Sequence, residues 1–296
     1  MIAYLILVHR YPEQFKRLFK AIYDPSNHYV VHVDKHSGPA LANEVALFLS
    51  TYENAAILDS KPALWGGYSL VDAALRGMAK ALEMNPDWRY FINLSGQDFP
   101  LKTQARIAAF LRANEGREFL RVLDQQRIRP DTLLRIKQVT IEAFGRIFRT
   151  PLRRPFLKGV RPYIGNQWMT VTREFCEFAS GDRRAARFKA FYRNSFIADE
   201  GFFPTLMMSS NSHGEIVSDD MRTIDWVPDG DIKLRPRTFV ASDVPMLTSG
   251  PNLFARKFDM SVDSEVIDLL EADLAAQSLA DTAMSASAPR GLTAAA

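Results

Sequence analysis

The stretch Ile2-Ala-Tyr-Leu-Ile-Leu-Val8 opens the chain with an uninterrupted apolar run, the pattern of a strand buried on both faces of a parallel sheet. Residues 12–23 follow with apolar side chains at helical spacing. Tyr29-Val-Val-His-Val33 is a second β-branched run, and it ends at Asp34. These segments predict a strand, a helix and a parallel strand, so the fold class is α/β.

The alternation of strands and helices continues beyond this unit. Asp34 and Asp98 each follow a predicted strand, and ligands of open parallel sheets bind at the carboxyl ends of strands. For Asp34, a hydrogen bond to a nucleotide and the role of a polar loop residue are equally supported. A Gly-x-Gly-x-x-Gly fingerprint is absent after the first strand. We expect further strands at 55–58 and 88–94 and helices at 41–49, 70–82 and 100–111.

Two carboxylates, Asp199 and Glu200, stand inside an apolar run that continues into Phe202-Phe203. Burying a charge is costly unless it is paired. One interpretation is the acidic first turn of a helix, which the local pattern favours. The other is a general base at the rim of a pocket.

A basic segment covers residues 121–161, with eleven Lys or Arg against three acids. A solvated excursion over the sheet is the simplest interpretation. There are two functional alternatives: the segment binds an anionic acceptor, or it contacts a membrane surface. Aromatic side chains at helical spacing add some support to the membrane contact, but the solvated excursion stays the favoured interpretation.

The bulk composition is that of a globular protein: 296 residues, 47% hydrophobic and 24% charged. The net charge of +3 does not argue for a nucleic-acid partner. The single cysteine, Cys176, excludes an internal disulfide framework and a cysteine-based zinc site. The opening apolar run is too short for a membrane span and lacks the flanks of a signal peptide. We therefore expect a cytoplasmic protein, or at most one peripheral to the inner face of the membrane.

Adjacent cations occur at Arg256-Lys257, between Phe254 and Phe258. Such a pair can clamp a diphosphate. It can equally be a surface charge pair with both phenylalanines in the core. Residues 262–274 predict a closing helix, and the Ala/Ser-rich residues 275–296 predict a disordered tail.

Several separated segments together resemble the core-2/I-branching glycosyltransferase family, which holds branching β-1,6-N-acetylglucosaminyltransferases and peptide O-xylosyltransferases. The resemblance covers residues 2 to 270. It rests on these segments in this order: Leu5-Ile-Leu-Val-His9, Arg17 to Tyr23, His32-Val-Asp34-Lys35, Trp65-Gly-Gly, Tyr90 to Pro100, Gly165-Asn-Gln-Trp168, Asp199-Glu200, Arg222 to Trp226 and Leu253 to Asp259.

The resemblance implies a variant GT-A fold, a Rossmann-like nucleotide-binding architecture with a mixed central sheet. A single domain over residues 1–274 is expected. Within it, 1–115 form mainly the nucleotide-binding half, 121–161 the basic excursion, and 162–274 the half that binds acceptor and diphosphate.

The resemblance also implies the roles of individual residues. Glu200 matches the catalytic base, with Asp199 as its support, and Trp168 and Trp226 are expected to contact the acceptor. No metal or cofactor is expected. The nucleotide-sugar site is expected to include Val8, Asp34, Trp65, Gly66, Ser95, Asp98, Arg256, Lys257 and either Arg235 or Arg237.

The implied activity is inverting, metal-independent transfer of N-acetylglucosamine or xylose from a UDP-sugar. The acceptor would be a hydroxyl of a glycan, a lipid-linked sugar or a peptide. Animal members carry a membrane anchor and many cysteines, so this chain is similar to a bacterial, cytoplasmic-side version. Two other functions stay open. One is a glycoside hydrolase that uses Asp98 and Glu200 as facing carboxylates. The other is a non-catalytic module that binds nucleotide or membrane.

Overall fold

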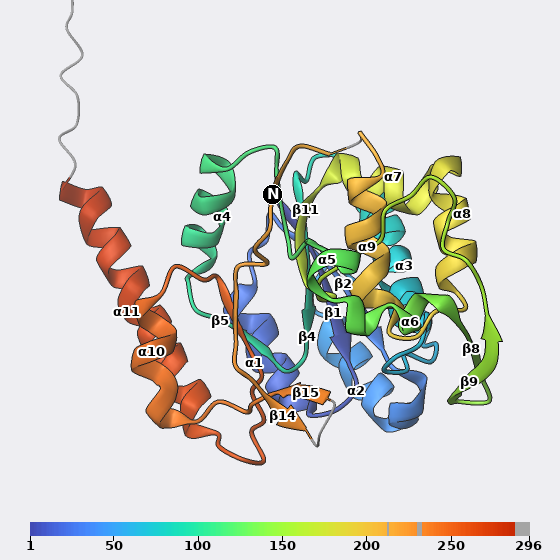
Figure 1. Ribbon diagram of the computed structural model, residues 1–296. Coiled ribbons are helices and arrows are strands. Elements are labelled where there is room, and N and C mark those ends of the chain that lie inside the picture. Colours follow the sequence, from blue (N-terminus) through green and yellow to red (C-terminus); the bar gives the residue numbers. More distant parts are fainter. Residues whose placement is uncertain (212, 230–232, 288–296) are drawn as a thin grey trace, which may run out of the picture.

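A seven-stranded mixed sheet forms the centre of the molecule (Figure 1), in a computed structural model that describes residues 1–211, 213–229 and 233–287. The first strand, β1, pairs in parallel with β2 and β4, which explains its continuous apolar run. Strand β11 runs antiparallel between β4 and β6. The predicted α/β fold with a mixed sheet is confirmed. In sheet order the strands are β12 (Glu215–Val217), β6 (Arg117–Leu120), β11 (Met169–Thr172), β4 (Tyr90–Ser95), β1 (Ile2–Val8), β2 (His28–Val33) and β3 (Ala55–Ile57).

Helices cover both faces of this sheet. Along β1, Tyr4 and Ile6 point into one core and Leu5 and Leu7 into the other, as the two-residue period of a strand requires. The first core is closed by α1 (Pro12–Ile22), α2 (Gly38–Leu49), α4 (Gln104–Ala113) and α10 (Val244–Ser249). The second is closed by α3 (Ser69–Met84), α7 (Arg173–Gly181), α8 (Arg183–Tyr192) and α9 (Ala198–Met208), which Figure 1 shows grouped on one side.

A smaller sheet lies at the carboxyl ends of the parallel strands. It has the order β13 (Arg222–Ile224), β16 (Phe254–Arg256) and β5 (Asp98–Pro100). Pro100 therefore pairs with Phe254 in a strand, and the helix expected from residue 100 begins at Gln104. This prediction was wrong because proline suits an edge strand as well as a first helical turn. The hairpin of β14 (Trp226–Asp229) and β15 (Lys233–Pro236) follows β13.

The basic segment, expected as an excursion over the sheet, consists of short helices and a two-stranded hairpin. Strands β8 (Gln138–Ala143) and β9 (Arg146–Arg153) form an antiparallel hairpin that turns at Phe144-Gly145. Before the hairpin come β7 (Leu123–Asp124), α5 (Gln125–Ile128), a 3-10 turn (Pro130–Thr132) and α6 (Leu134–Lys137), and after it comes β10 (Tyr163–Ile164). Elsewhere in the chain, 3-10 turns occur at Lys35–Ser37 and Ala241–Asp243.

The closing helix α11 (Glu265–Ser287) is longer than expected, so residues 275–287 are helical where the sequence predicted disorder. The physical reason is tertiary anchoring. Arg106 forms a bidentate pair with Asp281, and the Gln277 amide donates to the Leu101 carbonyl. The rest of the predicted tail, residues 288–296, lies outside the described residues. None of the helices described is both long enough and apolar enough to cross a bilayer.

Candidate active site

The carboxyl ends of β1, β2 and β4 are tied together by backbone hydrogen bonds. The Asp34 N–H donates to the Val8 carbonyl at 2.9 Å, and the Gly96 N–H donates to Leu7 at 2.9 Å. The Val8 side chain is buried in the core, so this residue serves the site through its backbone. Asp34 uses Oδ1 to accept from the N–H groups of His36 and Ala63, at 3.2 and 3.1 Å. Its Oδ2 makes no hydrogen bond to a described residue, which leaves that oxygen open to a ligand.

Asp98 is fully buried, and both of its oxygens are engaged. Oδ2 accepts from the Ser95 N–H at 2.9 Å, and Oδ1 pairs with Nη1 of Arg256 at 2.7 Å. The pair follows from the register of β5 and β16, which sets Asp98 opposite Arg256. Ser95 and Asp98 therefore fix the turn and orient an arginine.

Trp168 lies under two guanidinium groups. Arg256 is 4.6 Å from its ring centroid and Arg222 is 5.2 Å from it. Arg222 is itself buried and donates to the Asn93 carbonyl, and burial lowers the pKa of Arg222. The exposed fraction of Trp168 is 3%, so this predicted acceptor contact has little surface to offer and instead positions the arginines.

Lys257 follows Arg256 directly, and its ammonium group has no hydrogen bond or ion pair within the described part of the chain. Burial lowers the pKa of Lys257, and the charges of Arg10, Arg256 and Arg235 lower it further. Asp259 opposes this shift, but the positive groups outweigh it. The arrangement is suited to an anion with several charges.

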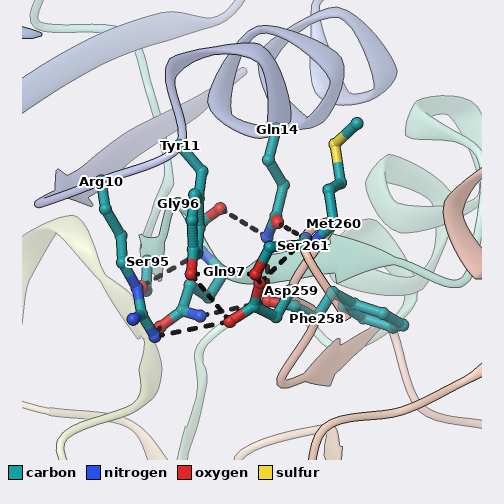
Figure 2. A network of polar contacts seen from close by, with 10 residues as sticks. All are labelled: Arg10, Tyr11, Gln14, Ser95, Gly96, Gln97, Phe258, Asp259, Met260 and Ser261. Carbon is teal, nitrogen blue, oxygen red and sulfur yellow. Dashed lines mark hydrogen bonds and ion pairs between the residues drawn. The ribbon is translucent and has the colours of Figure 1, made fainter. Parts of the chain in front are cut away.

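A polar network holds the segment after Lys257 against the strand ends (Figure 2). The Gln14 amide donates to the carbonyls of Gly96 and Phe258, both at 3.0 Å, and accepts from the Met260 N–H at 3.0 Å. Arg10 Nη2 donates to Gln97 Oε1 at 3.1 Å. These bonds join three segments that are far apart in sequence, and Arg10 also lies 3.8 Å from the carboxylate of Asp259, two residues after Lys257.

The structure separates the two arginines that the sequence left as alternatives. Arg237 donates to Asp225 at 2.6 Å and to both oxygens of Asp243 at 2.8 and 2.9 Å, and these carboxylates raise its pKa. Arg235 is exposed and has one long ion pair, 3.8 Å to Asp229. Arg235 is therefore the more available of the two.

The acids Asp199 and Glu200 occupy the first turn of α9, as the helical interpretation predicted. They differ in their surroundings. Asp199 is buried, its Oδ1 has no hydrogen-bond partner, and burial together with the neighbouring Glu200 raises its pKa to about 7. Glu200 Oε2 lies 2.5 Å from Nη1 of Arg135, and this cation opposes the rise in the Glu200 pKa that burial causes. The negative charge of the pair therefore resides on Glu200.

The segment 165–168 connects the acids to the cationic cluster. The Gly165 N–H donates to the Glu200 carbonyl at 2.8 Å, and the Gln167 carbonyl accepts from the Asn93 side chain at 2.7 Å. Trp168 then packs beneath Arg256. Glu200 and the cations thus belong to one continuous assembly.

The Trp65-Gly66 turn packs beside the start of α9. The Gly66 carbonyl accepts from the Ile197 N–H at 2.8 Å. Gly66 has a φ of 84°, and a Cβ there would lie 2.8 Å from the Phe196 ring, so glycine is required. Trp65 meets the same ring edge-on and is largely exposed. Trp226 is half-exposed on β14 and stays a candidate acceptor contact.

Three site residues were missed from the sequence, namely Arg10, Arg135 and Arg222. Arg10 lies two residues after the end of β1, a position that could have drawn attention to it. Arg135 is one of many cations in the basic segment, and Arg222 is the first residue of a segment that resembles the family but was assigned no role. Among the residues that the structure describes, no group of three or more His, Cys, Asp or Glu side chains is arranged to hold a metal ion.

Comparison with known proteins places this site in a family. The profile described as Core-2/I-Branching enzyme matches residues 2–248. The chain belongs to the Core-2/I-branching enzyme family. The predicted family is thereby confirmed.

Individual relatives of this family member are similar over nearly all of its length. A xylosyltransferase of Ciona intestinalis is 31% identical in an alignment of 289 positions that covers 91% of this chain and 34% of the relative. Xylosyltransferase 2 of Mus musculus is 31% identical and xylosyltransferase 1 of Rattus norvegicus 30% identical, with 33% and 35% of their lengths covered. The chain spans about a third of the length of these curated relatives. A UDP-glucose pyrophosphorylase structure from Leishmania major aligns at 12% identity over 70% of this chain and 51% of its own, with a TM-score of 0.26, too weak a likeness to support any conclusion.

Proposed function

We propose that this chain is an inverting glycosyltransferase that uses a UDP-sugar without a divalent metal. The observation that carries the proposal is the Lys257 ammonium, which lacks a described partner and lies near Arg10, Arg235 and Arg256 at the edge where β1, β2 and β4 end. Asp98 and Asp259 pair with Arg256 and Arg10, but no described carboxylate pairs with Lys257, and a nucleotide diphosphate would supply that partner.

The donor would lie across the edge of the sheet. Asp34 would accept a hydrogen bond from uracil or ribose through Oδ2, while Lys257 and Arg235 bind the diphosphate. Arg256 is turned to the same region but is already paired with Asp98, so it contributes charge more than a new hydrogen bond. Arg237 is engaged by two carboxylates and would act in the scaffold.

The reaction would be a single displacement at the anomeric carbon. An acceptor hydroxyl oxygen forms the new bond to that carbon as the bond to the diphosphate oxygen breaks. The hydroxyl proton passes to Glu200, and UDP leaves with the bonding electron pair. Glu200 suits the part of base because Arg135 favours its ionised form, whereas Asp199 is held protonated up to about neutral pH.

The leaving diphosphate gains negative charge in the transition state. In many enzymes a metal ion stabilises such charge, and here fixed cationic side chains are proposed to do so. The xylosyltransferase names of the relatives favour xylose as the transferred sugar, with N-acetylglucosamine as the alternative.

A screen of UDP-xylose, UDP-N-acetylglucosamine and UDP-glucose for binding and slow hydrolysis tests the proposal. Glu200→Gln should abolish turnover and leave UDP affinity within about twofold, because the base acts after the donor is bound. Glu177→Gln, an exposed acid on α7, is the matched control and should behave as wild type. Turnover near wild type in Glu200→Gln, or strict dependence on a divalent cation, would contradict the proposal.

The glycoside hydrolase alternative is weakened by the state of Asp98. A hydrolase needs two carboxylates that can give and take protons beside one bond. Asp98 is fully buried and shares its oxygens between Arg256 and the Ser95 N–H, so it is not free for that role. UDP titration separates the two functions, since a hydrolase has no reason to bind UDP.

A further inference from the structure

The hairpin of β8 and β9 has two different faces. Glu142 points inward, accepts from the Ser69 N–H at 3.0 Å and packs on Gly67. Ile147, its partner across the hairpin, reaches Gly66. The next cross-strand pair, Ile141 and Phe148, points the other way, with exposed fractions of 45% and 46%. The outward face is therefore apolar in a hairpin whose inward face is already packed.

The turn of the hairpin carries the most exposed large apolar side chain described. Phe144 is 98% exposed and has a φ of 50°, a conformation that favours glycine or asparagine over a bulky aromatic residue. An exposed ring on an unfavourable backbone does nothing for the fold itself. Its presence calls for a contact outside the fold.

Cationic side chains surround this apolar face. Residues 137–161 contain seven Lys or Arg and one acid, Glu142, whose carboxylate is turned inward. Arg146, Arg153 and Lys158 are exposed and form no ion pair or hydrogen bond through their side chains to any described residue. Figure 1 shows the hairpin at the margin of the molecule, beyond α6 and α8.

We propose that the tip and outward face of this hairpin, formed by Ile141, Phe144 and Phe148 with Arg146, Arg153 and Lys158, dock on an anionic membrane surface. An apolar tip enters the boundary between headgroups and acyl chains, while the surrounding cations bind the anionic headgroups. The protruding shape and the excess of unpaired positive charge favour a lipid surface over a protein groove. In this mode of membrane binding the tip of a hairpin inserts, and no helix is needed.

The location of the hairpin links docking to the candidate active site. A Cβ at Gly145 would lie 3.0 Å from the imidazole of His36, which is two residues from Asp34. Docking through Phe144 would thus turn the edge of the sheet where the UDP-sugar is proposed to bind toward the lipid. Binding to lipid itself needs neither donor nor turnover, so its test is independent of the proposed function.

Co-sedimentation with vesicles tests the inference. The whole chain should bind vesicles of phosphatidylcholine with phosphatidylglycerol, bind phosphatidylcholine alone more weakly, and dissociate as salt is raised. Phe144→Ser should lower the partition coefficient about tenfold, because the ring no longer enters the lipid. Leu47→Ser, which alters a 75% exposed side chain on α2, is the matched control and should bind as wild type.

Phe144→Trp provides a second measurement that does not rely on loss of binding. Its added fluorescence should shift to the blue when anionic vesicles are present, with binding retained. Three results would overturn the inference: no sedimentation of wild type with either vesicle at low salt, equal binding of Phe144→Ser and wild type, or a dimer in light scattering that Phe144→Ser dissociates. The last would show that a second copy covers this face.

Discussion

Arg135 of α6 holds Glu200 of α9 by an ion pair in which Nη1 and Oε2 are 2.5 Å apart. The neighbouring acid, Asp199, forms no ion pair with a described residue, and burial outweighs the weaker effect of Arg135 on its pKa. Two adjacent carboxylates in a poorly solvated place do not both ionise readily. The ion pair therefore decides which of them carries the charge, and it gives a physical reason for the unequal roles that the family resemblance implied.

Removal of this cation should shift the pH dependence of the reaction. In Arg135→Met, Glu200 loses the cation that opposes the effect of burial, so the pKa of Glu200 rises further. A base must be ionised, so the acid limb of kcat/KM should move to higher pH, while the rate on the plateau changes less. The control is Arg161→Met, which removes a basic-segment arginine that pairs with Asp124 instead. An unmoved acid limb would show that Glu200 is not the titrating base.

Asp199→Asn should change how stability depends on pH. The folded-state pKa of Asp199 is raised from 3.8 to about 7, so the folded protein binds a proton that the unfolded chain has lost. This contribution is fully present below pH 4, falls as pH rises, and is gone above about pH 8. The wild type should therefore lose about 4 kcal/mol relative to Asp199→Asn across that range. Urea unfolding of both proteins at several pH values measures the difference, and a constant difference would refute the assignment.

Substitution of Arg235 should lower the affinity for UDP, whereas substitution of Arg237 should lower the stability of the fold. Arg235→Ala removes an exposed cation near Lys257 and should weaken UDP binding about tenfold, with an unchanged melting temperature. Arg237→Ala leaves Asp225 and Asp243 without their partner and should cost about 1–2 kcal/mol of folding stability. Calorimetric titration with UDP and thermal unfolding measure the two effects. The reverse result would exchange the roles of the two arginines.

The sequence predicted the sheet better than it predicted the segments beside it. The apolar run of β1 indicates a strand inside a parallel sheet, because few other positions in a fold bury both faces of a strand. The basic segment has two interpretations, since Phe144, Ile147 and Phe148 suit a helical spacing as well as a hairpin with a turn at Phe144. Only pairing with its surroundings, such as Glu142 with the Ser69 N–H, selects the hairpin.

The site was predictable where its residues follow strand ends, and not where partners are distant in sequence. Asp34 and Asp98 were found by their positions after β2 and β4, yet the engagement of Asp98 with Arg256 depends on a pairing across 158 residues. The Arg135–Glu200 pair spans 65 residues and joins a segment for which the family resemblance gave no counterpart. Charge alone could not single out Arg135 among eleven cations.

Lys257 should matter more to UDP binding than any other single cation of the cluster. Its ammonium is part-buried, has no described partner, and has its pKa lowered by burial and by three arginines, so a bound diphosphate relieves repulsion as well as adding attraction. Lys257→Ala should weaken UDP binding by more than tenfold and should reduce the dependence of affinity on salt. A chelator should change neither wild type nor variant, because the proposed counter-charges are side chains. Lys102→Ala, at a lysine whose ammonium instead donates to the Thr248 carbonyl, is the control. If added divalent cations restored UDP binding in Lys257→Ala and chelation abolished it in the wild type, a metal and not Lys257 would hold the diphosphate.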